Sequence, residues 1–394
     1  MIALPERVMQ LASEQSHAPP SQLVREDGAE PLRVLFCVNW PVDRLSEPDS
    51  SRFSPDYLVS GQPYWFFKHV DQNVHVDVLD CRSILRFDRV ERRLAHCYPS
   101  KGILAWLRSR RYDVILCHGA QMGLVVGMLQ SLFPNMKQTP TVMFDVGSIS
   151  GGYNGWRHPK VIQACKFAIK SLSAAICHSS EQFKFYNDRY PEVTKIAHFI
   201  PLGVDTTEFQ PEPCVQEDEI ICVGYSMRKW ELLLRAYASL NTKTRLVLLG
   251  IPRERFIDQA GVICIPRVGI DEMRNWIRKA KFVVLPIPDV DFCIGQQTFL
   301  QCMALGKTVL LPSIPAVRDY IRDGETGVLY DVNSEEDLAR KLGALLSSSE
   351  TVERIGRAAR DATETQFAET FMADRVVALL RDVVRSGQSA NDAP

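Results

Sequence analysis

The sequence predicts an α/β protein built from two tandem Rossmann-like, doubly wound parallel-sheet domains that face a central cleft. Short apolar, β-branched segments alternate with helical patterns along most of the 394 residues. The alternation stops once, at an acidic stretch that contains two prolines, and then restarts. This length suits two domains, each able to bury its own core.

The first domain is predicted over residues 32–203, after a flexible leader over residues 1–31 that is rich in Ser, Gln, Pro and Glu. Continuous apolar runs predict strands that are buried on both faces. These runs are 32–40, 74–80, 112–118, 140–147, 174–180 and 195–203. The helical patterns between them are 63–72, 101–111, 123–133 and 158–172.

A linker is predicted over residues 204–218, and a second domain over 219–366. Its strands are predicted at 219–224, 245–250, 261–266, 282–288 and 308–312. Helices are predicted near 229–240, 271–280 and 296–305. An amphipathic helix over 367–385 is expected to pack back on the first domain, and residues 386–394 are expected to form a flexible tail.

Composition excludes several classes of function. The 46 basic and 47 acidic residues give a net charge of −1, which argues against nucleic acid as a partner. Eleven cysteines without a CxxC pair indicate a reducing cytoplasm and argue against structural zinc. Glu6, Arg7 and Gln10 interrupt the first apolar residues, so no secretory signal is predicted, and no apolar run reaches the length of a membrane span.

The common nucleotide-binding motifs are absent. Neither domain's first strand is followed by GxGxxG, and Gly306-Lys307-Thr308 lies between a helix and a strand, the reverse of the P-loop order. Two open α/β domains in tandem place the carboxyl ends of their strands against a shared cleft. The cleft is therefore the predicted ligand site.

The segment 289–311 is the first candidate for chemistry. After a short acidic loop, Gly295 opens a helix that begins with Gln296 and carries Gln297 and Gln301 one turn apart. Free N–H groups and the positive dipole at a helix entrance suit a phosphate, and a glycine permits its close approach. The alternative is an ordinary strand-to-helix turn with a solvated glutamine face.

Three segments in order resemble glycosyltransferase family 4, whose members use nucleotide sugars and have the two-domain GT-B fold. They are IPLGVDTTEFQP (200–211), the segment 289–311, and DGETGVLYDVNSEEDLA (323–339). The resemblance implies a sugar donor bound to the second domain and an acceptor bound to the first. It covers nearly the whole chain after residue 31.

This sequence departs from the family at its Glu-x7-Glu motif. Alignment on CMALGKTV (302–309) puts Gln301 at the glutamate that normally holds the ribose, and Cys293 at the one that meets the sugar. Gln301 can still hydrogen-bond a diol, whereas Cys293 cannot replace a carboxylate. Asp289 or Asp291 is the candidate replacement facing the sugar. Asp289-Val290-Asp291 also has the form of a metal-binding DxD motif. The prediction is nevertheless that the activity needs neither a divalent metal nor a cofactor.

The diphosphate requires cations, which the family places after the first strand of its second domain. Here Arg228 and Lys229 follow Gly224, and a guanidinium fork with an ammonium suits a diphosphate leaving group. The alternative is two exposed charges at a helix start. That arrangement is unfavourable because cations there oppose the helix dipole.

The acceptor side is predicted from strand ends in the first domain. His118 ends a strand before Gly119 and resembles the family histidine that faces the cleft. Asp145 stands where many relatives have another histidine and is a candidate to contact acceptor or sugar hydroxyls. A helix cap or turn cap is the alternative role. The long polar loop 39–63 is a candidate acceptor lid, with Gly61 near the following helix.

The resemblance implies a retaining glycosyltransferase that transfers a sugar from a nucleotide-diphosphate sugar to a glycan, a lipid-linked sugar or a small molecule. The alternatives are a degenerate fold-mate that binds without turnover, or an epimerase or phosphorylase on the same fold. Basic residues mixed with apolar ones over 156–172 raise one further alternative: peripheral contact with the inner membrane face rather than a plain solvated helix.

Overall fold

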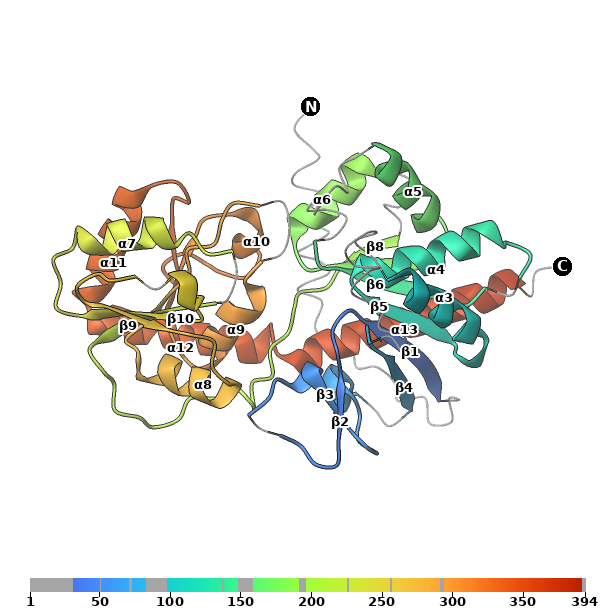
Figure 1. Ribbon diagram of the computed structural model, residues 1–394, viewed down its shortest axis with the longest axis horizontal. Coiled ribbons are helices and arrows are strands. Elements are labelled where there is room, and N and C mark those ends of the chain that lie inside the picture. The colour runs from blue at the N-terminus through green and yellow to red at the C-terminus, as the bar shows by residue number, and fades with distance from the viewer. Residues whose placement is uncertain are drawn as a thin grey trace.

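The computed structural model describes residues 31–49, 51–70, 73–82, 98–136, 138–147, 159–190, 196–224, 227–255, 257–290 and 294–391. They form two α/β domains side by side, with the N-terminal domain on the right of Figure 1 and the C-terminal domain on the left. The two parallel sheets confirm the predicted fold class. Apart from Pro31, the predicted leader lies outside the described residues.

The N-terminal sheet has six parallel strands in the order β4-β1-β5-β6-β7-β8. Their bounds are β1 Leu32–Val38, β4 Val74–Leu79, β5 Val114–His118, β6 Thr141–Asp145, β7 Ala174–Cys177 and β8 Ala197–Phe199. All six fall inside predicted runs. On β1, Val34 and Phe36 join one core cluster while Leu35 and Cys37 join another, which explains the continuous apolar sequence of a strand covered on both faces.

Helices cover both faces of this sheet. One face is covered by four helices: α3 Pro99–Arg108, α4 Ala120–Leu132, α5 Pro159–Ile169 and α6 Ser180–Arg189. The other face packs against the 3-10 helix η2, Trp65–His69, and against α13, Glu369–Asn391. Figure 1 shows α13 running along the N-terminal domain although it ends the chain.

The C-terminal sheet also has six parallel strands, in the order β11-β10-β9-β12-β13-β14. Their bounds are β9 Glu219–Val223, β10 Arg245–Leu249, β11 Val262–Ile265, β12 Val283–Val284, β13 Val309–Pro312 and β14 Val328–Tyr330. Its helices are α7 Trp230–Ala238, α8 Ile270–Lys279, α9 Gln296–Ala304, α10 Pro315–Arg318, α11 Glu335–Leu346 and α12 Ser349–Thr365. The sequence patterns predicted all of these strands except β14.

Strand order defines where each sheet opens. In the first domain successive strands add on one side of β1 and then, from β5 onward, on its other side. In the second domain the strand order changes sides in the same way between β9 and β12. Such switch points leave a crevice at the carboxyl ends of the two strands, because the following loops diverge. The candidate residues His118 and Gly224 end β5 and follow β9 respectively, so both lie at switch points.

The chain crosses between the domains twice, and the two crossings lie side by side. Val204 donates to the Phe367 carbonyl at 2.9 Å and accepts from Glu369 N–H at 2.9 Å. A Cβ on Gly203 would lie 2.7 Å from the Glu369 Cα, so this close approach requires glycine. This pairing joins the start of the predicted linker to the start of α13.

Three elements differ from the sequence expectation. Within the helical pattern predicted at 63–72, Trp65–His69 form the short 3-10 helix η2 rather than an α-helix, and Trp65 has φ of 49°, outside the α-helical region. The loop 39–63 contains a two-stranded parallel ribbon, β2 Asp43–Leu45 with β3 Tyr57–Val59, and the one-turn 3-10 helix η1, Ser54–Asp56. Helix α13 extends to Asn391, so much of the expected tail is helical.

Candidate functional site

The carboxyl edge of the C-terminal sheet brings the predicted donor residues together. Gly224 has φ of 141°, and a Cβ there would lie 2.4 Å from the Arg228 guanidinium. Arg228 Nε donates to the Val223 carbonyl at 3.1 Å, so the side chain folds back over the end of β9. The glycine therefore makes room for the arginine.

Lys229 connects this loop to the end of β12. Its backbone N–H donates to the Pro286 carbonyl at 2.8 Å, and Nζ lies 3.3 Å from the Val332 carbonyl. These contacts place the ammonium beside the end of β14. A cavity of about 670 Å³ lies there, lined in part by Val332, Asp331 and Arg318.

The entrance of α9 lies at the same edge. Gly295 has φ of 78°, and a Cβ would lie 2.6 Å from Ile287 Cδ1. No side chain caps this helix, so its first-turn N–H groups have no side-chain acceptor. Asp289 is exposed in the preceding loop, while Asp291 and Cys293 lie outside the described residues.

Burial separates the glutamines of α9. Gln297 is exposed, whereas Gln296 and Gln301 are only 3% and 6% exposed. Gln296 Nε2 has no hydrogen-bond partner among the described residues. The solvated-face alternative is therefore wrong for Gln296 and Gln301. A buried amide without a protein partner is a group that a ligand can satisfy.

His118 lies at the switch point of the N-terminal sheet, at the end of β5. Its ring contacts Trp40 at 4.7 Å and Trp65 at 5.6 Å between centroids, and packs beside Phe144. Burial, with the nearby His178, lowers the pKa of His118 to about 3. Nδ1 is buried without a hydrogen-bond partner in the described part of the chain. The imidazole is therefore neutral at physiological pH, and it is suited to hydrogen bonding rather than to charge.

Asp145 ends β6 and is fully buried. One carboxylate oxygen accepts from Gly147 N–H at 3.1 Å, and the other lies 3.2 Å from the Tyr186 hydroxyl, which donates to it. These contacts match the turn-capping alternative. Gly119 caps α4 with φ of 89°, and Gly61 lies in the exposed loop before η2 with φ of 77°.

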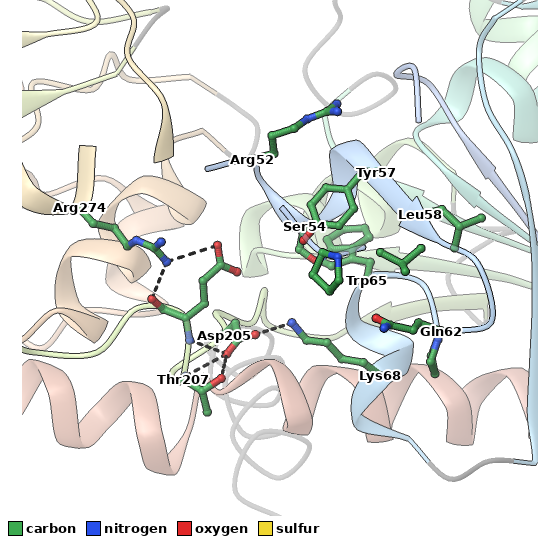
Figure 2. Close-up of a pocket in the computed structure, with 14 residues that line it drawn as sticks. Arg52, Ser54, Tyr57, Leu58, Gln62, Trp65, Lys68, Asp205, Thr207 and Arg274 are labelled. Atoms are coloured by element: carbon green, nitrogen blue, oxygen red, sulfur yellow. Dashed lines mark hydrogen bonds and ion pairs between the residues drawn. The ribbon is translucent and has the colours of Figure 1, made fainter. Parts of the chain in front are cut away.

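A cavity of about 560 Å³ opens between the domains beside Trp65 (Figure 2). From the N-terminal domain, Tyr57, Gln62 and Lys68 line it; Glu208 and Arg274 line it from the linker and α8. Aromatic faces next to polar groups suit a polyhydroxylated ligand. Trp65 lines this cavity and also contacts His118, and its positive φ is a strained backbone conformation. Strained residues of this kind often lie at functional sites.

A charged cluster lies beside this cavity and shares Lys68 and Asp205 with its lining. The Lys68 ammonium donates to Asp205 and lies 3.7 Å from Glu369 Oε2, and His69 Nε2 lies 3.1 Å from the same oxygen. Burial alone would raise the pKa of Asp205, but the bonds from Lys68 and Thr207 lower it well below its usual range. Burial and the neighbouring Asp205 raise the pKa of Glu208 to about 7.

His69, Asp205 and Glu369 have ligand atoms within 4.8 Å of one another, the spacing of a metal site. The Lys68 ammonium already bridges the two carboxylates, so a divalent ion would have to displace it. The sequence reasoning missed this cluster. Asp205 belongs to the quoted 200–211 motif, but no local pattern marks Trp65, Lys68 or Glu369, which come from distant segments.

Comparison with known proteins places the second domain in a class. Residues 217–348 match the family described as Glycosyl transferases group 1. A 124-residue segment is 28% identical to D-inositol 3-phosphate glycosyltransferase of Streptomyces griseus, covering 32% of this chain and 25% of that protein. The match to the enzyme of Streptomyces bingchenggensis is 27% over 113 residues. The chain thus aligns with about a quarter of the length of these relatives.

Solved structures extend the likeness in fold to both domains. Sucrose-phosphate synthase from Thermosynechococcus elongatus superposes with a TM-score of 0.64 at 14% identity, over 90% of this chain and 100% of that one. Anabaena HepE in complex with UDP and glucose gives 0.63 at 14% identity, over 89% and 100%. These neighbours show the GT-B fold. Support for a glycosyltransferase comes from the family match over residues 217–348.

Proposed function

We propose that this protein transfers a sugar from a nucleotide-diphosphate sugar to an acceptor hydroxyl, with retention of configuration and without a divalent metal. One observation carries the proposal: Gly224, Arg228, Lys229 and the entrance of α9 converge at the switch point of the second sheet. That convergence lies inside the segment that matches Glycosyl transferases group 1.

In the proposed reaction Arg228, Lys229 and the α9 N–H groups hold the diphosphate. As the bond to the sugar breaks, these groups stabilise the negative charge that grows on the leaving diphosphate. Gln301 hydrogen-bonds the nucleotide ribose. Catalysis rests on this electrostatic stabilisation and on positioning, with Asp291 facing the sugar.

The acceptor is proposed to occupy the cavity beside Trp65, with its hydroxyl directed toward neutral His118. Two comparisons support a small polyhydroxylated acceptor and a uridine donor. The relatives in Streptomyces are named for inositol phosphate, and HepE was solved with UDP-glucose. The proposed acceptors also include lipid-linked sugars and glycans. We further propose peripheral contact of the protein with the inner membrane face.

The deciding experiment is calorimetry with UDP-, GDP- and ADP-sugars. We expect one nucleotide to bind, Arg228→Ala to weaken that binding on the order of tenfold, and Gln301→Ala to cost about 1 kcal/mol, the net value of one hydrogen bond. Gln301→Glu should retain or tighten binding. Arg357→Ala is the matched control, because Arg357 is an exposed cation of the same domain. No binding by any sugar nucleotide would refute the donor assignment.

Metal independence has its own test. Since cations and a helix entrance take the role of the ion, activity should survive EDTA. Loss of activity that manganese or magnesium restores would instead make Asp289 and Asp291 metal ligands.

A second candidate function is binding without turnover, and the buried amide of Gln301 at the position of an expected carboxylate favours it. Tight nucleotide binding without transfer or donor hydrolysis across many acceptors would support that candidate. Turnover that Arg228→Ala abolishes would exclude it. Consumption of the sugar substrate without a hydroxyl acceptor would indicate an epimerase or a phosphorylase.

A further inference from the structure

The face of the N-terminal domain formed by α3, α4 and α5 exposes large apolar side chains, which elsewhere in the described chain are mostly buried. Seven large hydrophobic residues are exposed in the described chain, and five of them belong to α3, α4 and α5 or the residue that follows α4. We call these five the apolar ridge: Ile103, Leu107, Leu132, Phe133 and Phe167. The other two, Val215 and Met227, lie in the second half of the chain.

Contacts between the helices show that the residues of the ridge lie on neighbouring helices. Ile103 and Leu107 lie one turn apart on α3. The neighbouring Trp106 ring lies 5.4 Å from Phe133 at the end of α4. Ser131, just before Leu132, donates to the Phe167 carbonyl on α5 at 3.0 Å. The ridge therefore spans three adjacent helices.

The surroundings of the ridge are basic. Neither α3, α4, α5 nor the short helix η3 (Ser109–Arg111) contains an acidic residue. Exposed cations flank the ridge, namely Arg108, Arg110, Arg111, Lys160 and Lys170. Within the described residues, the three arginines form no ion pair, and the nearby Asp113 is paired with Arg33 at 2.7 Å. Since the whole chain carries a net charge of −1, this bias is local.

We infer that this face docks on an anionic phospholipid bilayer. Exposed apolar side chains enter the boundary between headgroups and acyl chains, while flanking lysines and arginines contact lipid phosphates. A second copy of the chain fits poorly, because two such faces would bring like charges together. The inference deepens the peripheral membrane contact in the proposed function and names the surface that makes it.

The position of the ridge leaves the cleft accessible. Leu107, Leu132 and Phe167 lie near the carboxyl ends of their helices, just before β5, β6 and β7 begin. The ridge thus lies toward the opposite edge of the sheet from His118, which ends β5. A protein docked through the ridge keeps its cleft open to a soluble donor.

Vesicle co-sedimentation with the full chain tests the inference. We expect binding to vesicles of phosphatidylcholine mixed with phosphatidylglycerol, no binding to phosphatidylcholine alone, and release by salt. Because each cation strengthens attachment to an anionic surface, Arg110→Glu with Arg111→Glu should weaken binding on the order of tenfold or more. Leu107→Ser with Phe133→Ser should weaken it comparably. All four side chains are exposed, so the variants should fold.

Controls separate this inference from its rivals. Val215→Ser and Arg357→Glu alter exposed side chains elsewhere and should leave vesicle binding unchanged. Charge reversal that abolishes binding while Leu107→Ser with Phe133→Ser does not would overturn insertion of the ridge. A dimer that these serine variants convert to monomer would make the ridge a self-interface and refute docking. Nucleotide calorimetry on the same variants reports the donor site separately, so the two proposals can fail independently.

Discussion

At the scale of single residues, local geometry decides what each candidate can do. Gln301 and Gln296 look equivalent to the exposed Gln297 in the sequence, yet α9 buries the first two. Asp145 and His118 both end strands, but Asp145 is satisfied by Gly147 and Tyr186 whereas His118 Nδ1 is not satisfied within the described residues. Strand-end position predicts which residues reach the cleft edge, and only packing shows which polar atoms remain available.

Gly224 provides a residue-scale prediction. A methyl group at Gly224 would collide with the Arg228 guanidinium, and an alanine there would have to adopt φ of 141°. Gly224→Ala should therefore displace the arginine. Loss of a charge-assisted hydrogen bond should weaken nucleotide diphosphate binding by roughly tenfold or more, measured by calorimetry. Gly324→Ala is the control, because Gly324 also has positive φ but no atom within 4 Å of the added carbon. Equal losses in both variants would contradict a specific role for Arg228.

At the scale of elements, hydrogen bonds from distant side chains fix the connection between the domains, which the sequence pattern describes only as a linker. The Tyr320 hydroxyl, just after α10, donates to the His178 carbonyl at 2.7 Å and accepts from Leu202 N–H at 2.9 Å. Arg360 on α12 donates to the carbonyls of Thr206, Phe209 and Ala304 at 2.6–3.1 Å. The segment 204–209 is therefore tightly anchored to the C-terminal domain.

Arg360 gives the prediction at this scale. Arg360→Ala removes the donor from three carbonyls and should lower the free energy of unfolding by roughly 2–4 kcal/mol, because unsatisfied buried acceptors are costly. Arg357→Ala, one turn earlier on the same helix and 71% exposed, should change it by less than about 0.5 kcal/mol. Chemical denaturation of both variants measures the difference. Similar values would show that Arg360 does not anchor the linker.

At the scale of the whole molecule, buried titratable groups couple stability to pH in opposite directions. Burial lowers the pKa of His118 to about 3 and of His178 to about 4. The unfolded chain binds these protons near pH 6.5, so this contribution to stability is lost as the pH falls below that value. Glu208 acts in the opposite sense, since its pKa is raised from 4.5 to about 7 by burial and Asp205.

The pH prediction isolates Glu208. Between pH 4.5 and about 7 the native protein keeps a proton that the unfolded chain has lost, so stability falls as pH rises through this window. Wild type should lose up to about 3 kcal/mol relative to Glu208→Gln across it, measured by denaturation at both ends. Glu353→Gln, at an exposed side chain, should run parallel to wild type. Parallel behaviour of Glu208→Gln would show that Arg274 and Lys68 keep Glu208 ionised.

The sequence by itself determined the alternation of strands and helices, the restart at residue 219 and the loops that carry Gly224, Arg228 and Gly295, because apolar periodicity and glycine placement are local properties. The tertiary structure decided the strand order, the burial of Gln301, the strained turn at Trp65 and the cluster of Lys68, Asp205 and Glu369. Those features depend on contacts between segments up to 304 residues apart, as between Trp65 and Glu369. No local pattern records which distant side chains packing will bring together.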